Sequence, residues 1–107
     1  MAIVRYVFAA LKPGVDREEY ERYEREVDYV VAAKLKSIIS YRTHRLTGVS
    51  PPIGGGPWDY VERIEITDRA AYDAEIATLG KDLISELYEK YLDRSKTKSL
   101  WTVLVDP

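Results

Sequence analysis

The chain has 107 residues, with 16 Lys or Arg, 18 Asp or Glu and one His, so its formal net charge is −2. This length predicts a single domain spanning residues 1–107. The lack of cysteine excludes disulfides, thiolate nucleophiles and Cys-based metal sites, and a single histidine excludes multi-histidine metal sites. The acidic balance and the lack of a long apolar segment predict binding to neither nucleic acid nor membranes. Because Arg5 interrupts the apolar N-terminal run, we expect a cytoplasmic protein without a signal peptide.

The first half of the chain begins with a strand and a helix. Residues 2–10 are rich in β-branched and aromatic residues and precede a Pro-Gly turn, which predicts a strand. Residues 16–35 predict a helix in which Asp16 accepts the amide of Glu19 as an N-cap. The apolar stripe of this helix is Tyr20, Tyr23, Val27, Val30, Val31 and Leu35. The side chains expected on its solvated face are Glu21, Arg22, Glu24, Arg25 and Glu26.

The remaining segments complete a known arrangement. Residues 37–47 and 58–67 predict two strands, a helical region interrupted at Gly80 follows Asp68, and a last strand ends the chain. The order strand, helix, strand, strand, helix, strand predicts an α+β fold. It is the ferredoxin-like βαββαβ sandwich, with helices on one face of a four-stranded antiparallel sheet. The glycine run Gly54–Gly56 suits either a lid over a pocket or a long hairpin connection.

The first and last strands are apolar on both faces. In the first strand, Val4, Tyr6 and Phe8 alternate with Ile3 and Val7. Helices cover only one side of such a sheet, and monomers rarely expose an apolar patch of this size. We therefore expect a homodimer in which two sheets pack face to face, forming a dimeric α+β barrel.

Two side chains suit proton transfer. His44 has the only side chain that ordinarily titrates near neutral pH, and by alternation it shares a strand face with Ile38 and Arg42. Glu62 lies on the interior face of its strand, where a carboxylate must be paired or protonated. It is either the acid partner of His44 or a structural partner of Arg5 or Arg42, and His44 is either a general acid–base group or a half-exposed strand residue.

The aromatic content is unusual, with nine Tyr against one Phe. The tyrosines expected to fill the core from the helices are Tyr20, Tyr23, Tyr72, Tyr88 and Tyr91. Tyr6, Tyr41 and Tyr60 lie on strands. Since each buried hydroxyl needs a hydrogen-bonding partner, this excess predicts a hydroxyl-lined cavity for a flat aromatic ligand, unless the hydroxyls merely reach water.

Three segments together resemble one protein family. They read IVRYVFAALKPGVDREEYERYEREVD, KLKSIISYRTHRLTG and PWDYVERIEITD. In these motifs the chain resembles the RedY/HapK-like proteins of the dimeric α+β barrel superfamily, from residue 3 to about residue 78.

The resemblance implies a cofactor-free tailoring enzyme that acts on a pyrrole or indole intermediate in the biosynthesis of prodiginine- or bisindole-type pigments. The reaction implied is a cyclisation or condensation, in some members the collapse of a carbamic acid to a cyclic amide. Neither a cofactor nor a metal is expected. We expect His44 to transfer the proton, Glu62 to polarise or orient the substrate, and Tyr6 or Tyr60 to stabilise an oxyanion. The residues expected to contact the substrate are Tyr60, Arg42, Tyr23, Tyr41 and Trp58.

Other branches of the superfamily define the alternatives. Haem-degrading members rely on an asparagine, and this chain has none. Trp58 and Trp101 would suit a cofactor-independent monooxygenase of an aromatic metabolite, and Tyr41 with His44 resembles the pair of polyketide cyclases. A non-catalytic protein that binds a labile intermediate, or a plain dimerisation module, would also fit the fold, because fold does not determine chemistry.

Overall fold

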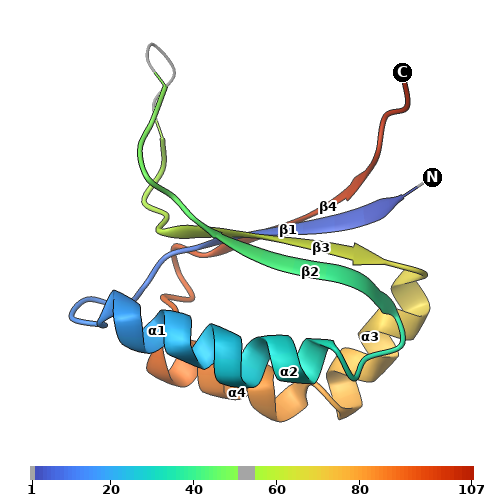
Figure 1. Cartoon of the computed structure of the whole chain (residues 1–107), viewed down its shortest axis with the longest axis horizontal. Coiled ribbons are helices and arrows are strands. Elements are labelled where there is room, and N and C mark those ends of the chain that lie inside the picture. Colours follow the sequence, from blue (N-terminus) through green and yellow to red (C-terminus); the bar gives the residue numbers. More distant parts are fainter. Residues whose placement is uncertain (1, 51–54) are drawn as a thin grey trace.

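The computed structural model describes residues 2–50 and 55–107, and its element order is the predicted one (Figure 1). The strands are β1 (Ile3–Ala9), β2 (Ile38–Arg45), β3 (Tyr60–Ile66) and β4 (Lys98–Val103). They form a single antiparallel sheet in the order β2-β3-β1-β4. The predicted α+β ferredoxin-like fold is thereby confirmed.

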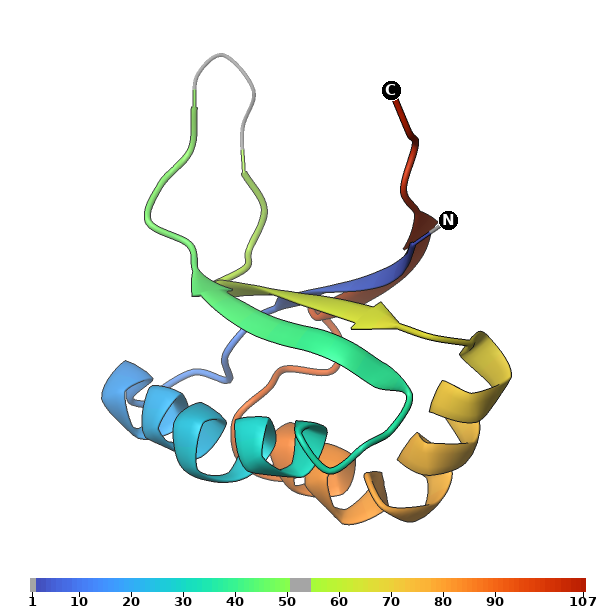
Figure 2. The same cartoon turned by 45° about the vertical axis from the view of Figure 1, so that its right-hand side comes forward.

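The helices all cover the same face of this sheet. The first helical segment is continuous and consists of α1 (Arg17–Tyr23), the π-helical turn η1 (Glu24–Asp28) and α2 (Tyr29–Ala32). The second consists of α3 (Arg69–Thr78) and α4 (Lys81–Lys90). Figures 1 and 2 show α1, α2 and α4 beneath the sheet and α3 at one end, with the C-terminus on the opposite side. We call the sheet face toward the helices the inner face and the other the outer face.

Both predicted N-caps are present. The side chain of Asp16 accepts the amide of Glu18, at 3.2 Å, rather than that of Glu19 as the sequence predicted. Asp68 accepts the amide of Ala71 at 2.8 Å. Each cap satisfies a backbone donor that the first helical turn would leave unpaired. None of the helices in the described part of the chain is long and apolar enough to cross a membrane.

The π-helical turn changes which side of the first helix faces the sheet. Its amide at Tyr29 donates to the carbonyl of Glu24, five residues back. This wider turn rotates the following residues relative to a regular α-helix. At its end Asp28 is buried and beyond it Val30 is 47% exposed, whereas Glu24, one turn after Tyr20, is buried as regular helical spacing already allows. The prediction that Glu24 faces solvent was therefore wrong.

Strand alternation places the inner-face side chains. On β3, Tyr60, Glu62, Ile64 and Ile66 are buried, as the sequence predicted. On β2 the pairing shifts between Ile38 and Ser40, so one extra residue interrupts the alternation. Ile38 consequently packs against the core, while His44 and Arg42 are exposed. The prediction that Ile38 shares a face with His44 was wrong for this reason.

Tyrosine rings fill much of the core. The ring of Tyr20 lies 4.9 Å from that of Tyr60 and 5.7 Å from that of Tyr91, between centroids. The ring of Tyr23 lies 4.8 Å from that of Tyr91. The predicted role of helix tyrosines as core residues is confirmed for these positions, and Tyr72 is buried as well.

Candidate functional site

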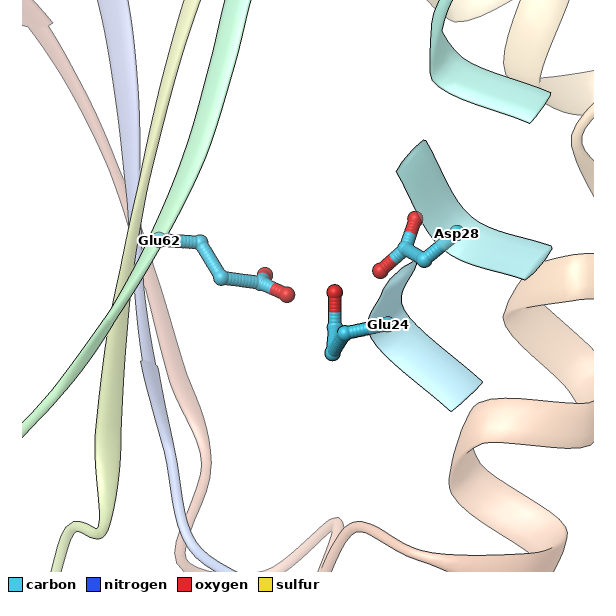
Figure 3. A group of neighbouring side chains, drawn as sticks. All are labelled: Glu24, Asp28 and Glu62. Atoms are coloured by element: carbon cyan, nitrogen blue, oxygen red, sulfur yellow. The ribbon is translucent and has the colours of Figure 1, made fainter. Parts of the chain in front are cut away.

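Three carboxyl groups meet inside the molecule, and we call them the carboxyl cluster. Glu62 projects from β3, and Glu24 and Asp28 project toward it from η1 (Figure 3). One oxygen from each group lies within 4.8 Å of the others. The three residues are only 2–5% exposed. Their positions follow from strand alternation on one side and from the π-helical turn on the other.

The hydroxyl of Tyr41 joins two members of the carboxyl cluster. Its oxygen lies 2.7 Å from Asp28 Oδ2 and 2.7 Å from Glu62 Oε1. A phenol has a single proton, so it donates in only one of these contacts. In the other, the phenol oxygen must accept a hydrogen bond from a protonated carboxyl group. The geometry therefore requires one of the two carboxyl groups to be protonated.

Burial and mutual repulsion raise the pKa values of the carboxyl cluster. Burial, followed by the charge of Asp28, raises the pKa of Glu62 to about 7, against the lowering effect of the Tyr41 hydrogen bond and of Arg5. Burial and the neighbouring carboxylates also raise the pKa of Glu24, and burial raises that of Asp28. A carboxyl group with a pKa of about 7, as Glu62 has, exchanges protons near neutral pH, as general acids and bases must.

The carboxyl cluster lies against a mainly apolar cavity between the inner face and the helices. The volume of this cavity is about 70 Å³. A single buried water needs roughly 10–15 Å³. The polar side chains on its wall are Arg5, Asp28, Tyr41, Glu62, Tyr72 and Tyr88. Aliphatic residues such as Ile64, Leu83 and Leu87 form most of the remainder. Its mainly apolar lining with a few polar groups is typical of ligand pockets, whereas its volume is smaller than the roughly 150 Å³ of a cavity that holds benzene.

Among the described residues, the carboxyl cluster is the group whose oxygens lie close enough together to bind a metal ion. Three carboxylate oxygens are hard ligands of the kind that Mg²⁺, Ca²⁺ and Mn²⁺ bind. Glu24 Oε1 and the Tyr20 hydroxyl are buried without a hydrogen-bonding partner among the described residues. A cation or additional protons would each neutralise the carboxyl cluster, and the Tyr41 contacts call for at least one proton.

Of the eight residues expected at the site, Glu62 and Tyr41 line this cavity. Tyr60 is on the same sheet face, but its hydroxyl donates to Glu21 Oε2 at 2.7 Å, away from the carboxyl cluster. Tyr23 is buried against Tyr91 and does not line the cavity. The inner face therefore holds three of the expected residues, Tyr23 belongs to α1, and the cavity brings Glu62 and Tyr41 together.

The other four expected residues belong to the outer face or its edge. His44 pairs with Val61, and Tyr6 pairs with Arg63, both in positions that alternate with the inner-face residues. Arg42 is exposed. Trp58 packs on Phe8 with 5.1 Å between ring centroids and donates to the carbonyl of Lys96 at 2.8 Å.

The outer-face position of His44 separates it from Glu62. Since Glu62 pairs with Thr43, the neighbour of His44, the two side chains point to opposite faces. The expected acid–base pair does not form within one chain. The alternative of an ion pair with Arg42 fails for the same reason, and Arg5 is not within ion-pair distance of any described carboxylate. The Gly54–Gly56 segment, expected to be either a lid or a hairpin connection, begins at Gly54, which lies outside the described residues.

Sequence reasoning missed Glu24, Asp28 and the cavity position of Arg5. The apolar stripe through Val27, Val30 and Val31 suggested a regular helix with Glu24 on its solvated face, and Asp28 was given no role. The detectable signal was the four-residue spacing from Tyr20 through Glu24 and Asp28 to Ala32, which also lies along one side of a helix. On β1, Arg5 shares a face with Ile3 and Val7, so parity alone could have assigned it to the inner face.

The fold is shared with several solved structures. HapK from Hahella chejuensis is 22% identical, with a TM-score of 0.71 over 97% of this chain and 96% of that one. A dabb family protein with a ferredoxin-like fold from Mesorhizobium loti is 16% identical, with a TM-score of 0.71 over 99% and 100%. A dimeric ferredoxin-like protein of unknown function from Jannaschia sp. is 12% identical, with a TM-score of 0.76 over 97% and 100%.

No curated protein matches the chain. The family model described as REDY-like protein HapK matches residues 3–105, almost the whole chain. This match extends well beyond the segments that carry the resemblance in sequence. The chain therefore belongs to the HapK family of REDY-like proteins.

Proposed function

We propose that this protein is a cytoplasmic, cofactor-free enzyme that closes a ring on a small pyrrole or indole intermediate of prodiginine- or bisindole-type biosynthesis. The observation that carries the proposal is the Tyr41 hydroxyl, held 2.7 Å from both Asp28 and Glu62 on the wall of the cavity. This contact keeps a protonated and an ionised carboxyl group side by side, which supports acid and base catalysis at one place. The substrate class and pathway follow from the family resemblance.

The proposed reaction is a ring closure with loss of water. A nucleophilic atom of the substrate attacks its carboxyl or carbamic acid carbon and loses a proton to the ionised member of the Asp28–Glu62 pair. The protonated member gives its proton to the departing hydroxyl, which leaves as water. The Tyr41 hydroxyl can pass a proton between the two carboxyl groups, so the pair returns to its starting state. Holding the reacting atoms together supplies much of the rate.

We further propose that the chain works as a homodimer through its outer face. Leu100, opposite Tyr6 in the β1–β4 pairing, is 55% exposed, and Leu104 is 50% exposed. Packing two such faces together would remove this apolar surface from water. Light scattering should give twice the chain mass of 12.3 kDa. A mass of 12.3 kDa would disprove the homodimer.

The enzymatic proposal is tested with purified protein and a pyrrole- or indole-bearing amine in bicarbonate, which forms the carbamic acid in solution. Mass spectrometry should detect a cyclic product that has lost water, formed faster than in buffer alone. Glu62→Gln should reduce this rate by about 100-fold or more, because the amide cannot exchange a proton. Arg63→Gln, the next residue on the same strand but on the outer face, is the matched control and should leave the rate unchanged.

The same assay separates the alternatives. Turnover that consumes oxygen would indicate a monooxygenase instead of a cyclase. Tight product binding without any acceleration would indicate a non-catalytic binding protein. A full rate in Glu62→Gln would exclude the proposed acid–base role of the carboxyl cluster.

A further inference from the structure

Arg5 is the cationic group on the wall of the cavity, and its side chain is held in place from several directions. Its Nε donates to Ser99 Oγ at 2.7 Å, and its Nη1 donates to the Tyr72 hydroxyl at 2.8 Å. The guanidinium carbon lies 5.9 Å from the centre of the Tyr72 ring and 6.0 Å from that of Trp101. These contacts fix the guanidinium plane before any ligand arrives.

The charge of Arg5 is not matched by an ion pair. No carboxylate of residues 2–50 or 55–107 lies within 4.0 Å of the guanidinium, and its Nη2 donates to none of their atoms. Eight other basic side chains of the described chain do have such a partner or bind a backbone carbonyl; they are Lys12, Arg17, Arg25, Arg42, Arg45, Arg63, Arg69 and Lys90. A fixed guanidinium with a spare donor, on the wall of a mainly apolar cavity, is suited to bind an anion.

The position of Arg5 relates that anion to the carboxyl cluster. Arg5 pairs with Ile64 on β3, and Glu62 pairs with Val7, so Arg5 and Glu62 are diagonal neighbours on the inner face. Arg5 and Glu62 line the same cavity, and aliphatic side chains form most of the rest of its wall. A ligand bound through its acid group to Arg5 would place an attached flat ring among these aliphatic residues and beside Tyr41.

We propose that Arg5 binds the carboxylate or carbamate of the substrate, which takes up one proton from solvent before its ring closes, so that the ligands of this cavity are small flat aromatic acids. This inference rests on the proposed function for its location and adds the substrate class. The neutral amide of the same ring should bind less well, because it lacks the charge that a guanidinium recognises. Outer-face arginines should have no part in this preference.

The test is calorimetric titration of the full chain with pyrrole-2-carboxylate and with pyrrole-2-carboxamide. We expect the acid to bind at least about tenfold more tightly than the amide, the lower limit for a charged hydrogen bond. Arg5→Met should abolish this preference while leaving amide affinity within about twofold, and Arg5→Lys should retain part of it. Arg63→Met is the matched control on the outer face and should retain the full preference.

Equal affinity for acid and amide in the unmodified protein would overturn the proposal, as would the absence of acid binding at millimolar concentration. An equal loss of affinity for the acid and the amide in Arg5→Met would also overturn the proposal, because it would show that Arg5 has a purely structural role. If Arg5→Met does not fold, the comparison of acid, amide and methyl ester on the unmodified protein still decides. Trp101 emission in a Trp58→Phe variant should change on acid binding, since Trp101 is next to Arg5.

The titration involves no turnover, which separates the two proposals. Acid-selective binding that needs Arg5, without any ring closure, would disprove the proposed function alone. Ring closure that needs Glu62 but is unaffected in Arg5→Met would disprove the role of Arg5 alone.

Discussion

The two faces of the sheet place their ionisable side chains in different environments. The inner face buries Glu62 against two helix carboxyl groups, whereas the outer face exposes Arg42 and His44 to solvent. Glu62 and Arg63 are consecutive residues, yet alternation sends them to opposite sides. The comparison shows that burial, more than residue type, selects the groups suited to proton transfer. Histidine is the usual choice near neutral pH, but here buried carboxyl groups are in the cavity and the single histidine is not.

The largest expected effect is on catalysis. Tyr41→Phe removes the hydroxyl that joins Asp28 to Glu62 and should lower kcat/KM for ring closure by about 100-fold or more. His44→Ala should change it by less than about twofold, since His44 is on the outer face. A large loss in His44→Ala with little change in Tyr41→Phe would instead indicate an active site on the outer face, with the role first expected for His44.

The next effect is on stability. Ile64→Ala should lower the free energy of unfolding by about 2–5 kcal/mol, because Ile64 is buried on the inner face and its loss leaves a cavity. Val61→Ala, on the outer face of the same strand, should cost roughly 1 kcal/mol or less. Urea denaturation of both variants gives the comparison. Similar losses would show that Val61 lies in the tightly packed centre of the proposed dimer contact rather than at its edge.

A third effect is the pH dependence of stability. The pKa of Glu62 is raised to about 7 in the folded chain, so the folded state holds a proton that the unfolded state releases above about pH 4.5. Its contribution to stability is complete at low pH and is lost as the pH rises through 7. We expect the free energy of unfolding to fall by on the order of 1–3 kcal/mol from pH 5 to pH 8. Glu62→Gln should flatten this decrease in denaturation curves.

Glu21 is the comparison for that pH profile. Its hydrogen bonds from Arg45 and Tyr60 lower its pKa to about 2, and its contribution has the opposite sign. That stability is present above about pH 4.5 and is lost as the pH falls through 2. Glu21→Gln should therefore change unfolding only in acid, without altering the decrease between pH 5 and pH 8.

The smallest expected effect is that of metal ions. If protons neutralise the carboxyl cluster, EDTA or millimolar Mg²⁺ or Mn²⁺ should shift the Tm by less than about 1 °C, because a ligand that does not bind the native state cannot stabilise it. A rise of several degrees that Glu24→Gln removes would instead show that the carboxyl cluster binds a cation. Differential scanning fluorimetry is sufficient for this measurement.

Most of the fold could be predicted from the sequence, because the strand alternation and the N-caps are local patterns. The inward position of Glu62 followed from the same alternation. The rest of the carboxyl cluster could not be predicted in this way. A π-helical turn alters the phase of the helix at Glu24, and an extra residue near Ile38 alters the phase of β2. Both irregularities depend on packing between elements, which a single-period pattern does not contain.

The π-helical turn also contains a residue that a regular α-helix would not need. Deleting one residue between Glu24 and Asp28 would leave the two acids three positions apart, and side chains three positions apart still lie on the same side of an α-helix. Both acids would therefore still face the sheet, while the helix would become shorter by about 1.5 Å. In this scaffold a single-codon deletion would change the spacing of the acidic groups in the cavity without removing either of them.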